Sequence, residues 1–318
     1  MSVFFPGGLP SPYFVWRNGE LQPWAAATLH ISAFGAAGHI TVFEGIKAYR
    51  SHDGRQLNVF RLPEHIQRLL DSMTVTRMPH RFSCEQWFAA TLDLLRANTT
   101  RDDTYIRPVA GYTGTEHVSF AQTLGAPPEC IIWNRPFTST LPDGGGLSVG
   151  SSSWARFPDN VVAARVKSMS NYINGRYATL EALVNGYDDV LQTDSAGHIT
   201  EMSGAAVFVR RKGELATPPV TANILESITR DTLLHLLREA LGIPVVERPI
   251  DRSEVYVAEE VFCCGTAAEV RPVVALDRIP IGGGQVGPLT RRVQRLYHDV
   301  VRGAEPRYAH WLTPVYAA

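Results

Sequence analysis

A stretch near the middle of the chain constrains its organisation more than any other feature. Residues 135–146 read RPFTSTLPDGGG, with two prolines and three consecutive glycines. Such a stretch disfavours a regular element and is typical of a linker. At 318 residues the chain is long enough for about two domains, each with its own core. We therefore expect a small N-terminal domain over residues 1–134, a linker over 135–146 and a larger C-terminal domain over 147–318.

The part of the chain before this linker carries clear signals for strands and helices. Asn18-Gly19 is a hairpin turn signal that follows the apolar residues 13–16. Pro63 suits the first turn of a helix, and Ser83 with Gln86 forms a capping box at the start of a second one. We expect helices over 61–78 and from Ser83, and strands over 13–16, 104–112 and 130–133.

The part after the linker mixes strands with helices. Strands are expected over 147–153, 188–194, 206–210, 243–248 and 260–264, and helices near 171–186, 227–241 and 288–302. Short turns such as 194–197 indicate antiparallel hairpins rather than a uniform alternation of parallel strands and helices. The pattern therefore predicts the α+β class.

Composition excludes several classes of protein. Apolar residues make up 45% and charged residues 19% of the chain, which is ordinary for a globular protein. A net charge of −1 argues against a nucleic-acid or anionic-membrane surface. No apolar stretch approaches the roughly 20 residues of a membrane span, and no signal-peptide pattern is present. The cysteines follow neither metal-ligand nor secreted-disulfide spacing, so we expect a cytoplasmic protein without a metal site.

Lysine is rare in this chain, which limits the number of residues that could carry amine chemistry. Lys47, Lys167 and Lys212 are the only lysines among 30 lysines and arginines, so a Schiff base has three candidates. Lys47 lies on an expected strand, and Lys212 lies in a charged turn. Lys167 leads into an expected helix through residues 168–172. We choose Lys167, because desolvation there would lower its pKa toward the neutral amine that such chemistry needs; the alternative is an ordinary surface lysine.

Four further features fit the binding of a phosphorylated pyridine aldehyde. A carboxylate such as Glu201 would keep the ring nitrogen protonated. Ser227 caps an amphipathic helix whose N-terminus suits a phosphate, and the small residues of 265–269 allow close backbone approach. Arg61 offers a positive fork at a helix start. Each feature has an ordinary alternative: a solvated glutamate, a capped helix without ligand, a plain turn, and an arginine at a helix start, where the helix dipole calls for an anionic partner.

Together these stretches resemble the class IV (fold type IV) pyridoxal-phosphate aminotransferases, and among them the branched-chain amino acid aminotransferases most closely. The motifs that carry the resemblance extend over nearly the whole chain. They are WRNG at 16–19, VFEGI at 42–46, YIRP at 105–108, residues 167–172, GYD at 186–188, Glu201, ITRD at 228–231, GTAAE at 265–269 and residues 306–315.

The resemblance implies a two-domain fold with a smaller N-terminal α/β domain and a larger, barrel-like C-terminal α+β domain. It implies pyridoxal 5'-phosphate as the cofactor, with Lys167 as Schiff-base lysine and proton shuttle. The cofactor-binding residues would be Arg61, Tyr172, Glu201, Leu225, Ile228, Thr229 and Thr266. The substrate side would be Gly38, Phe43, Gly45, Tyr105, Arg107 and Ala267. An amino donor and a keto acid would be the small-molecule partners, and the enzyme would be a homodimer or higher homo-oligomer.

The chain departs from the branched-chain pattern mainly on the substrate side. The usual Tyr-Gly pair before the Phe-Glu-Gly motif is replaced by Gly38 and His39. The loop after Pro108 contains His117 and lacks the usual Gly-Met-Gly turn. These changes would enlarge the pocket and make it more polar. A further departure, Ala206 in place of an asparagine, has no interpretation from the sequence.

The expected reaction moves an amino group between a branched-chain or related amino acid and a 2-oxo acid. Three alternatives stay open: an (R)-selective amine or D-amino acid transaminase, a lyase similar to aminodeoxychorismate lyase, and a catalytically silent relative. Tyr105 and Arg107 favour a substrate that bears a carboxylate. The Tyr-Ile-Arg-Pro motif counts against the lyase.

Overall fold

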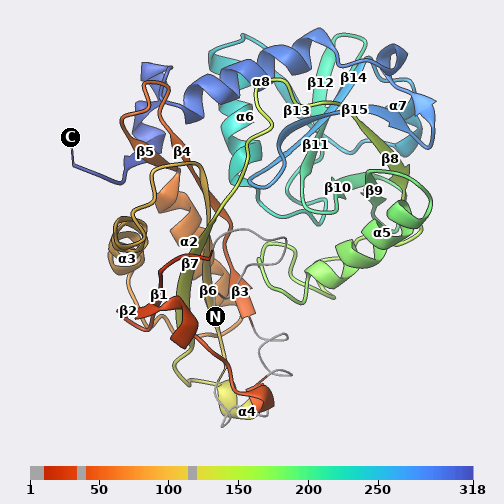
Figure 1. Cartoon of the computed structure of the whole chain (residues 1–318). Helices are drawn as coiled ribbons and strands as arrows, with labels where there is room; N and C mark the ends of the chain where they lie inside the picture. The colour runs from red at the N-terminus through yellow and green to blue at the C-terminus, as the bar shows by residue number, and fades with distance from the viewer. Residues whose placement is uncertain (1–10, 34–40, 114–119, 318) are drawn as a thin grey trace. The chain divides into compact units, whose positions relative to one another are not determined.

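The computed structural model of the chain describes residues 11–33, 41–113 and 120–317. Contacts divide the chain into two compact units, whose elements are labelled in Figure 1. Unit 1 comprises Met1–Ser139, Val166–Ser170 and Asp299–Ala318, and unit 2 comprises Thr140–Arg165 and Asn171–His298. Each unit is described by itself.

Unit 1 is built on an antiparallel sheet. Within the described residues its strands are β1 (Phe14–Arg17), β2 (Glu20–Pro23), β3 (Thr41–Phe43), β4 (Ile46–Arg50), β5 (Leu57–Phe60), β6 (Thr104–Gly111), β7 (Glu129–Pro136) and β17 (Leu312–Pro314). Their order is β17-β5-β4-β6-β7-β1-β2, and β3 pairs with β6. The helices are α2 (Leu62–Val75), α3 (Cys84–Ala97) and the short α4 (Phe120–Thr123). Three 3-10 turns, η1 (Trp24–Ala26), η2 (Ile31–Ala33) and η4 (Pro306–Trp311), complete the unit.

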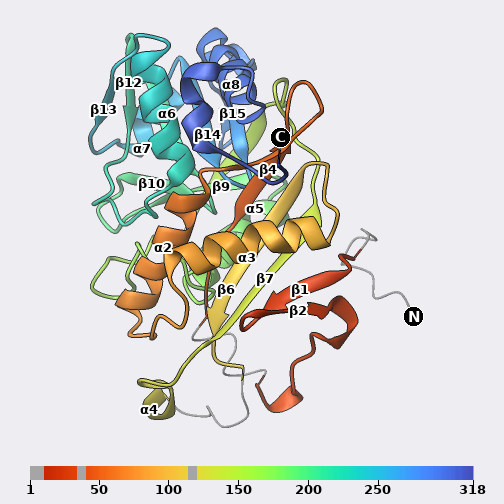
Figure 2. The ribbon, with the colours of Figure 1, turned by 90° about the vertical axis from the view of Figure 1, so that its left-hand side faces the viewer.

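Local sequence accounts for most of these elements. Asn18 and Gly19 adopt positive φ values of 55° and 105°, and they join β1 to β2 as the expected hairpin. The capping box at α3 is confirmed, because the Ser83 hydroxyl accepts from the Gln86 N–H and the Gln86 side chain accepts from the Ser83 N–H. Figure 2 shows α3 across one face of the sheet, over β6 and β7. Buried Trp87 of α3 packs there against Trp16 of β1 at 5.5 Å between ring centroids.

Alternation along β6 determines which side chains face away from this core. Thr104, Ile106 and Ala110 are buried, whereas Tyr105 and Arg107 are half-buried. Successive side chains of a strand point to opposite faces. Tyr105 and Arg107 therefore share one face of the sheet.

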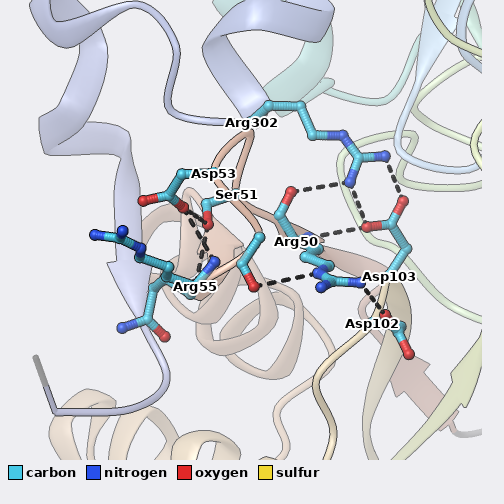
Figure 3. Close-up of polar contacts among 9 residues, drawn as sticks. Arg50, Ser51, Asp53, Arg55, Asp102, Asp103 and Arg302 are labelled. Carbon is cyan, nitrogen blue, oxygen red and sulfur yellow. Dashed lines mark hydrogen bonds and ion pairs between the residues drawn. The ribbon is translucent and has the colours of Figure 1, made fainter.

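The C-terminal segment of unit 1 is tied to the sheet by charge as well as by β17. The Arg302 guanidinium makes two contacts with the Asp103 carboxylate, at 2.6 and 2.5 Å, and donates to the Arg50 carbonyl at 2.9 Å (Figure 3). Asp103 also accepts from the Arg50 N–H at 2.9 Å. The Arg50 side chain extends this cluster toward Asp102 at 3.3 Å.

Unit 2 is built on a mixed sheet. In the described part of the chain its strands are β8 (Leu147–Ser151), β9 (Asp189–Thr193), β10 (Ile199–Met202), β11 (Ala206–Arg211), β12 (Glu214–Thr217), β13 (Val245–Glu247), β14 (Glu260–Gly265), β15 (Glu269–Leu276) and β16 (Ile279–Pro280). The order is β10-β9-β8-β15-β14-β11-β12-β13, with β16 on β15. The helices are α5 (Tyr172–Val184), α6 (Ile228–Glu239), α7 (Arg252–Tyr256) and α8 (Pro288–Val301), whose last residues belong to unit 1, and η3 (Gly282–Gly284) is a 3-10 turn.

The two edges of this sheet approach each other. The Ile199 N–H of β10 donates to the Ile250 carbonyl at 2.8 Å, and His198 forms an isolated bridge with Asp251. Residues 250–251 follow β13 closely in the chain, so the edge strand β10 meets the segment after the opposite edge. This arrangement agrees with the barrel-like form that the resemblance implied.

The mixed fold class expected from the sequence is confirmed, with some corrections in detail. The pairs β8–β9, β8–β15 and β12–β13 are parallel, so antiparallel hairpins do not account for the whole sheet. The expected strand 243–248 is shorter, and Glu201, which precedes the apolar strand β11, itself lies in the short strand β10. Beta strands extend to Pro136 and resume at Leu147, so 137–146 is the irregular part of the expected linker. The domain boundaries stay a prediction. No helix among the described residues is long and apolar enough to cross a membrane.

Candidate active site

In unit 1 the candidate lysine lies on a segment that pairs with a strand. The Phe43 N–H donates to the Lys167 carbonyl at 2.9 Å, and the Met169 N–H donates to the Thr41 carbonyl at 2.9 Å. Val42 and Ser168 form an antiparallel bridge between these bonds. The Lys167 N–H donates to the Ser72 hydroxyl of α2 at 3.1 Å. Both backbone polar groups of Lys167 are therefore fixed by unit 1.

Two cationic side chains gather at the Phe43 ring. The Lys167 ammonium lies 4.9 Å and the Arg107 guanidinium carbon 4.0 Å from its centroid. Arg107 also contacts the Met169 sulfur at 3.4 Å. A cation over an aromatic face is attracted by the ring quadrupole, so Phe43 helps to place both groups. The structure thus brings together Lys167, Phe43 and Arg107.

Gly45 and Tyr105 are in close contact beside this group. A Cβ atom built on Gly45 would lie 2.0 Å from the Tyr105 hydroxyl oxygen and 2.8 Å from its ring carbon Cζ. Side-chain atoms do not approach so closely without a shift. Glycine is therefore required at position 45 as long as Tyr105 keeps its place.

Arg61 lies at the start of α2 with a partner from its own helix. Its backbone adopts the left-handed conformation, with φ at 50°, and its Nε donates to Glu64 Oε1 at 2.8 Å. The guanidinium lies 5.2 Å from the Trp311 ring. The anionic partner that the helix position calls for is thus at least Glu64.

In unit 2 the candidate carboxylate is buried and paired. Glu201 lies on β10 with 7% of its surface exposed, and its Oε1 contacts Arg156 Nη2 at 2.5 Å. Arg156 is held in turn by the Asn223 carbonyl at 3.3 Å. Sequence reasoning missed Arg156, because nothing in the local pattern around it indicates a pairing partner 45 residues away.

The remaining candidates of unit 2 lie at element ends. Ser227 caps α6 as expected, since its hydroxyl accepts from the Arg230 N–H at 3.2 Å. Ile228 and Thr229 open the helix and are buried, and half-buried Leu225 precedes it. Tyr172 opens α5 and is 38% exposed.

The hairpin between β14 and β15 supplies the last candidates. Gly265 pairs with Glu269, so Thr266, Ala267 and Ala268 form the loop. A Cβ on Gly265 would lie 3.0 Å from the Gly204 carbonyl, which belongs to the turn after Glu201. The small residue therefore allows this loop to lie close to the 203–204 turn, and its approach to a ligand stays a prediction. Gly38, His39 and His117 lie outside the described residues.

A buried charge cluster in unit 1 was also missed. Glu44 is fully buried and accepts from Arg68 at 2.7 and 2.8 Å, and its Oε2 lies 2.8 Å from His65 Nδ1. Burial would raise the pKa of Glu44, but Arg68 and the His65 hydrogen bond hold that pKa well below its usual range. Burial lowers the pKa of His65, and Arg68 and Lys167 lower it further against the opposing effect of Glu44. The sequence did contain a signal for this cluster, because polar residues lie on an otherwise apolar face of α2.

Comparison with known proteins identifies the family. The sequence profile described as "Amino-transferase class IV" matches residues 41–276. A probable branched-chain-amino-acid aminotransferase from Aquifex aeolicus is 38% identical, over 95% of this chain and 97% of the relative. The holo structure of the branched-chain amino acid aminotransferase from Thermobaculum terrenum matches with a TM-score of 0.92 and 42% identity, over 96% of this chain and 99% of that one. The enzyme from Thermoproteus uzoniensis, solved with norvaline, has a TM-score of 0.90 and 35% identity, over 96% and 100% of the two chains.

These matches cover most of the chain and agree with the mixed α/β fold. The chain belongs to the class IV aminotransferases. It is therefore a transaminase, and pyridoxal phosphate is the cofactor that this family uses. The residues present fit that cofactor, because the units offer an amine at Lys167, a carboxylate already paired with a cation at Glu201 and a capped helix start at Ser227.

Proposed function

We propose that this transaminase moves an amino group between an amino acid with a branched or similarly apolar side chain and a 2-oxo acid. The observation that carries the proposal is the place of Arg107 over Phe43, 4.0 Å from the ring and beside Lys167. A fixed guanidinium is well suited to a carboxylate. The relatives that are named for branched-chain amino acids add support, as does the norvaline complex of one of them.

Lys167 and Glu201 have the central roles in this proposal. Lys167 would hold the cofactor through Nζ, and the same amine would move the substrate α-proton. When bound, pyridoxal phosphate supplies an electron-withdrawing ring that stabilises negative charge at the substrate α-carbon. Glu201 would hold the proton on the ring nitrogen of the cofactor, and Arg156 orients the Glu201 carboxylate through a contact of 2.5 Å.

The other cofactor residues hold the phosphate and the ring. The N–H groups at Ile228 and Thr229 suit the phosphate, because the N-terminus of a 12-residue helix presents free donors and a positive dipole end. Arg61 and Thr266 add donors to the same group. Tyr172 would bind the ring hydroxyl, and Leu225 would pack on the ring.

The substrate side comprises Phe43, Gly45, Tyr105, Arg107 and Ala267, with Gly38 near them in the chain. Arg107 binds the substrate carboxylate, and Phe43 limits the space around the α-carbon. An amine without a carboxylate would leave the Arg107 charge unpaired, which disfavours the amine transaminase. Donors with and without a carboxylate therefore separate the proposal from its alternatives.

The test is a spectral titration of the purified enzyme loaded with pyridoxal phosphate. We expect a visible band that L-leucine bleaches, that 2-oxoglutarate restores, and that (R)-1-phenylethylamine and D-alanine leave in place. Lys167→Ala should lose the band, while Lys212→Ala, a lysine in an exposed turn, should keep it. Bleaching by the (R)-amine or the D-amino acid instead of L-leucine would contradict the substrate proposal, and pyruvate release without an acceptor would reveal the lyase.

We also infer a homo-oligomer in the cytoplasm. One stripe of α5 carries Ile173, Tyr177, Leu180 and Val184, which are 42%, 47%, 44% and 87% exposed. These residues follow helical spacing, and an exposed apolar stripe is typical of an association surface. The cysteines at 84, 130, 263 and 264 are free, which suits a reducing compartment.

The oligomer is tested by light scattering during size-exclusion chromatography. Leu180→Glu should shift the protein toward a monomer, because a charge desolvated in an apolar interface is costly. Lys212→Glu, which places a new carboxylate on an exposed turn, is the control and should leave the mass unchanged. A wild-type protein that is monomeric in solution would contradict the proposed homo-oligomer.

A further inference from the structure

One stripe of α2 carries polar side chains into the interior of unit 1. His65, Arg68 and Ser72 follow each other at spacings of three and four residues, so they lie on one face of the helix. His65 is 2% and Ser72 is 1% exposed. Ile66, Leu69 and Met73 beside them are fully buried, as is usual for a helix face that packs on a core. Buried polar residues on such a face need partners.

At one end of this stripe, His65 and Arg68 bind Glu44, the residue between Phe43 and Gly45. Arg68 makes a two-point contact with the Glu44 carboxylate, and His65 makes a third contact at 2.8 Å. The Glu44 N–H donates to the Pro108 carbonyl at 2.8 Å, and the Gly45 N–H donates to the Glu44 carboxylate at 3.2 Å. A buried carboxylate with this many partners has one arrangement. The contacts of Glu44 with α2 thereby fix its neighbours Phe43 and Gly45.

The other end of the stripe holds the lysine. Ser72 Oγ accepts from the Lys167 N–H at 3.1 Å, and the Lys167 carbonyl accepts from the Phe43 N–H at 2.9 Å. The path from Arg68 through Glu44, Phe43 and Lys167 back to Ser72 begins and ends on α2. Lys167 therefore has two anchors on one rigid element, one direct and one through β3.

Charged groups of both signs lie along this path. Glu44 and Arg68 form a pair of opposite sign, and the charged groups that influence His65 are Glu44, Arg68 and Lys167. Two cations near a buried imidazole favour its neutral form. The Lys167 amine is thus one of two cations that act on a histidine whose neutral form is favoured.

We propose that Ser72 is a positioning residue for Lys167, and that the Glu44–His65–Arg68 cluster fixes the strand segment on which Lys167 and Phe43 meet. The inference rests on the proposed role of Lys167. Removal of the Ser72 oxygen would take away the acceptor of a half-buried backbone N–H and would free one of the two anchors. The Lys167 side chain would then sample positions away from the reacting atoms.

The experiment compares Ser72→Ala with Thr91→Val in the loaded enzyme. Thr91 is a fully buried helical hydroxyl of α3 that donates to the Trp87 carbonyl at 2.8 Å, so its loss costs the fold one comparable hydrogen bond without touching the lysine. The readouts are the melting temperature, kcat and KM with L-leucine, and the pH midpoint of the visible cofactor band.

We expect similar melting temperatures for the two variants and different chemistry. Ser72→Ala should lower kcat by roughly 10- to 100-fold with KM nearly unchanged, because misplacement of a catalytic group by about 1 Å has an effect of that size. Its spectral midpoint should move by at least about half a pH unit, whereas Thr91→Val should keep both wild-type values. Ser72→Thr keeps the hydroxyl and should recover most of the kcat.

Two results would overturn the inference. If Ser72→Ala matches Thr91→Val in kcat and in spectral midpoint, Ser72 has a structural role alone, and the proposed function stands. If the wild-type enzyme has no band that depends on Lys167, the proposed function fails and the inference fails with it. The two failures are distinguished by the Lys167→Ala control.

Discussion

At the scale of single residues, nonlocal contacts decide what the sequence leaves open. Lys167 and Glu201 could be chosen as candidates from residue type and surroundings, since few lysines are available and the carboxylate precedes an apolar strand. Arg156 and Ser72 were not found, because their partners depend on how distant segments pair. Ala206 faces Cys264 across β11 and β14, and nothing in the structure explains the loss of the family asparagine.

Gly45 and Tyr105 give the first prediction at this scale. Gly45→Ala should lower kcat/KM by roughly 10-fold or more, because the new methyl group must displace the Tyr105 ring. Tyr105→Ala removes the obstacle, so the double variant should be no worse than Tyr105→Ala alone. Steady-state kinetics of the four proteins measures this coupling, and losses that simply add would show that the contact does not limit position 45.

Arg156 gives the second prediction at the scale of single residues. Arg156→Gln should weaken cofactor retention by roughly 10-fold, because Glu201 would lose the cation that orients it. Arg156→Lys keeps the charge without the planar fork, so its cofactor retention should lie between those of the wild type and of Arg156→Gln. Cofactor release during dialysis, followed by absorbance, is the measurement. Equal release from all three proteins would mean that Arg156 has no part in holding Glu201.

At the scale of elements, local patterns predicted helices better than strand partners. α2 and α3 were expected from apolar spacing and a capping box, and both occur with ends within about three residues of the prediction. The pairing of Val166–Ser170 with β3 and the parallel pairs of β8 could not be expected, because register between distant segments depends on tertiary packing. The polar stripe of α2 was visible in the sequence but carried no indication of its partner Glu44.

Stability in acid is a prediction about α2. Unfolded histidine has a pKa of about 6.5, and the pKa of folded His65 is lower, so protons bind the unfolded chain preferentially as pH falls below that value. The contribution of His65 is complete above pH ~6.5 and is lost as pH falls toward its folded pKa. Glu44, whose folded pKa is depressed, adds a further loss below about pH 4.5.

Urea unfolding between pH 7 and pH 5 measures this effect. His65→Gln keeps a donor for Glu44 but does not titrate, so its unfolding free energy should fall less steeply with pH than that of the wild type. The wild-type excess slope has an upper limit of about 1.4 kcal/mol per pH unit for one proton. Parallel slopes in the two proteins would show that His65 does not titrate differently on folding.

At the scale of the whole molecule, the C-terminal segment Asp299–Ala318 belongs to unit 1 by its contacts. β17 pairs with β5, the Val315 carbonyl accepts from Arg96 at 2.6 Å, and Trp311 packs by Arg61. The C-terminal motif was visible in the sequence, but its strand partner was not. A strand of three residues has too little pattern to indicate a partner about 250 residues away.

The Arg302 cluster supplies the prediction at this scale (Figure 3). Arg302→Ala should lower the free energy of unfolding by about 1–3 kcal/mol, since Asp103 would lose a two-point partner in a largely buried site. Asp53→Ala, a change in an exposed turn of the same region, should have a small effect. Chemical denaturation measures both, and an Arg302→Ala protein as stable as the wild type would show that the segment is held by β17 alone.

The most direct test of the central claim uses the scarcity of lysine. Borohydride reduction of the loaded enzyme fixes the cofactor to the amine that carries it, and peptide mass mapping then locates the added mass. With lysines at 47, 167 and 212 only, the assignment has few candidates. The account predicts the modification on the peptide that contains Lys167. Modification at Lys47 or Lys212, or at none of the three, would contradict it.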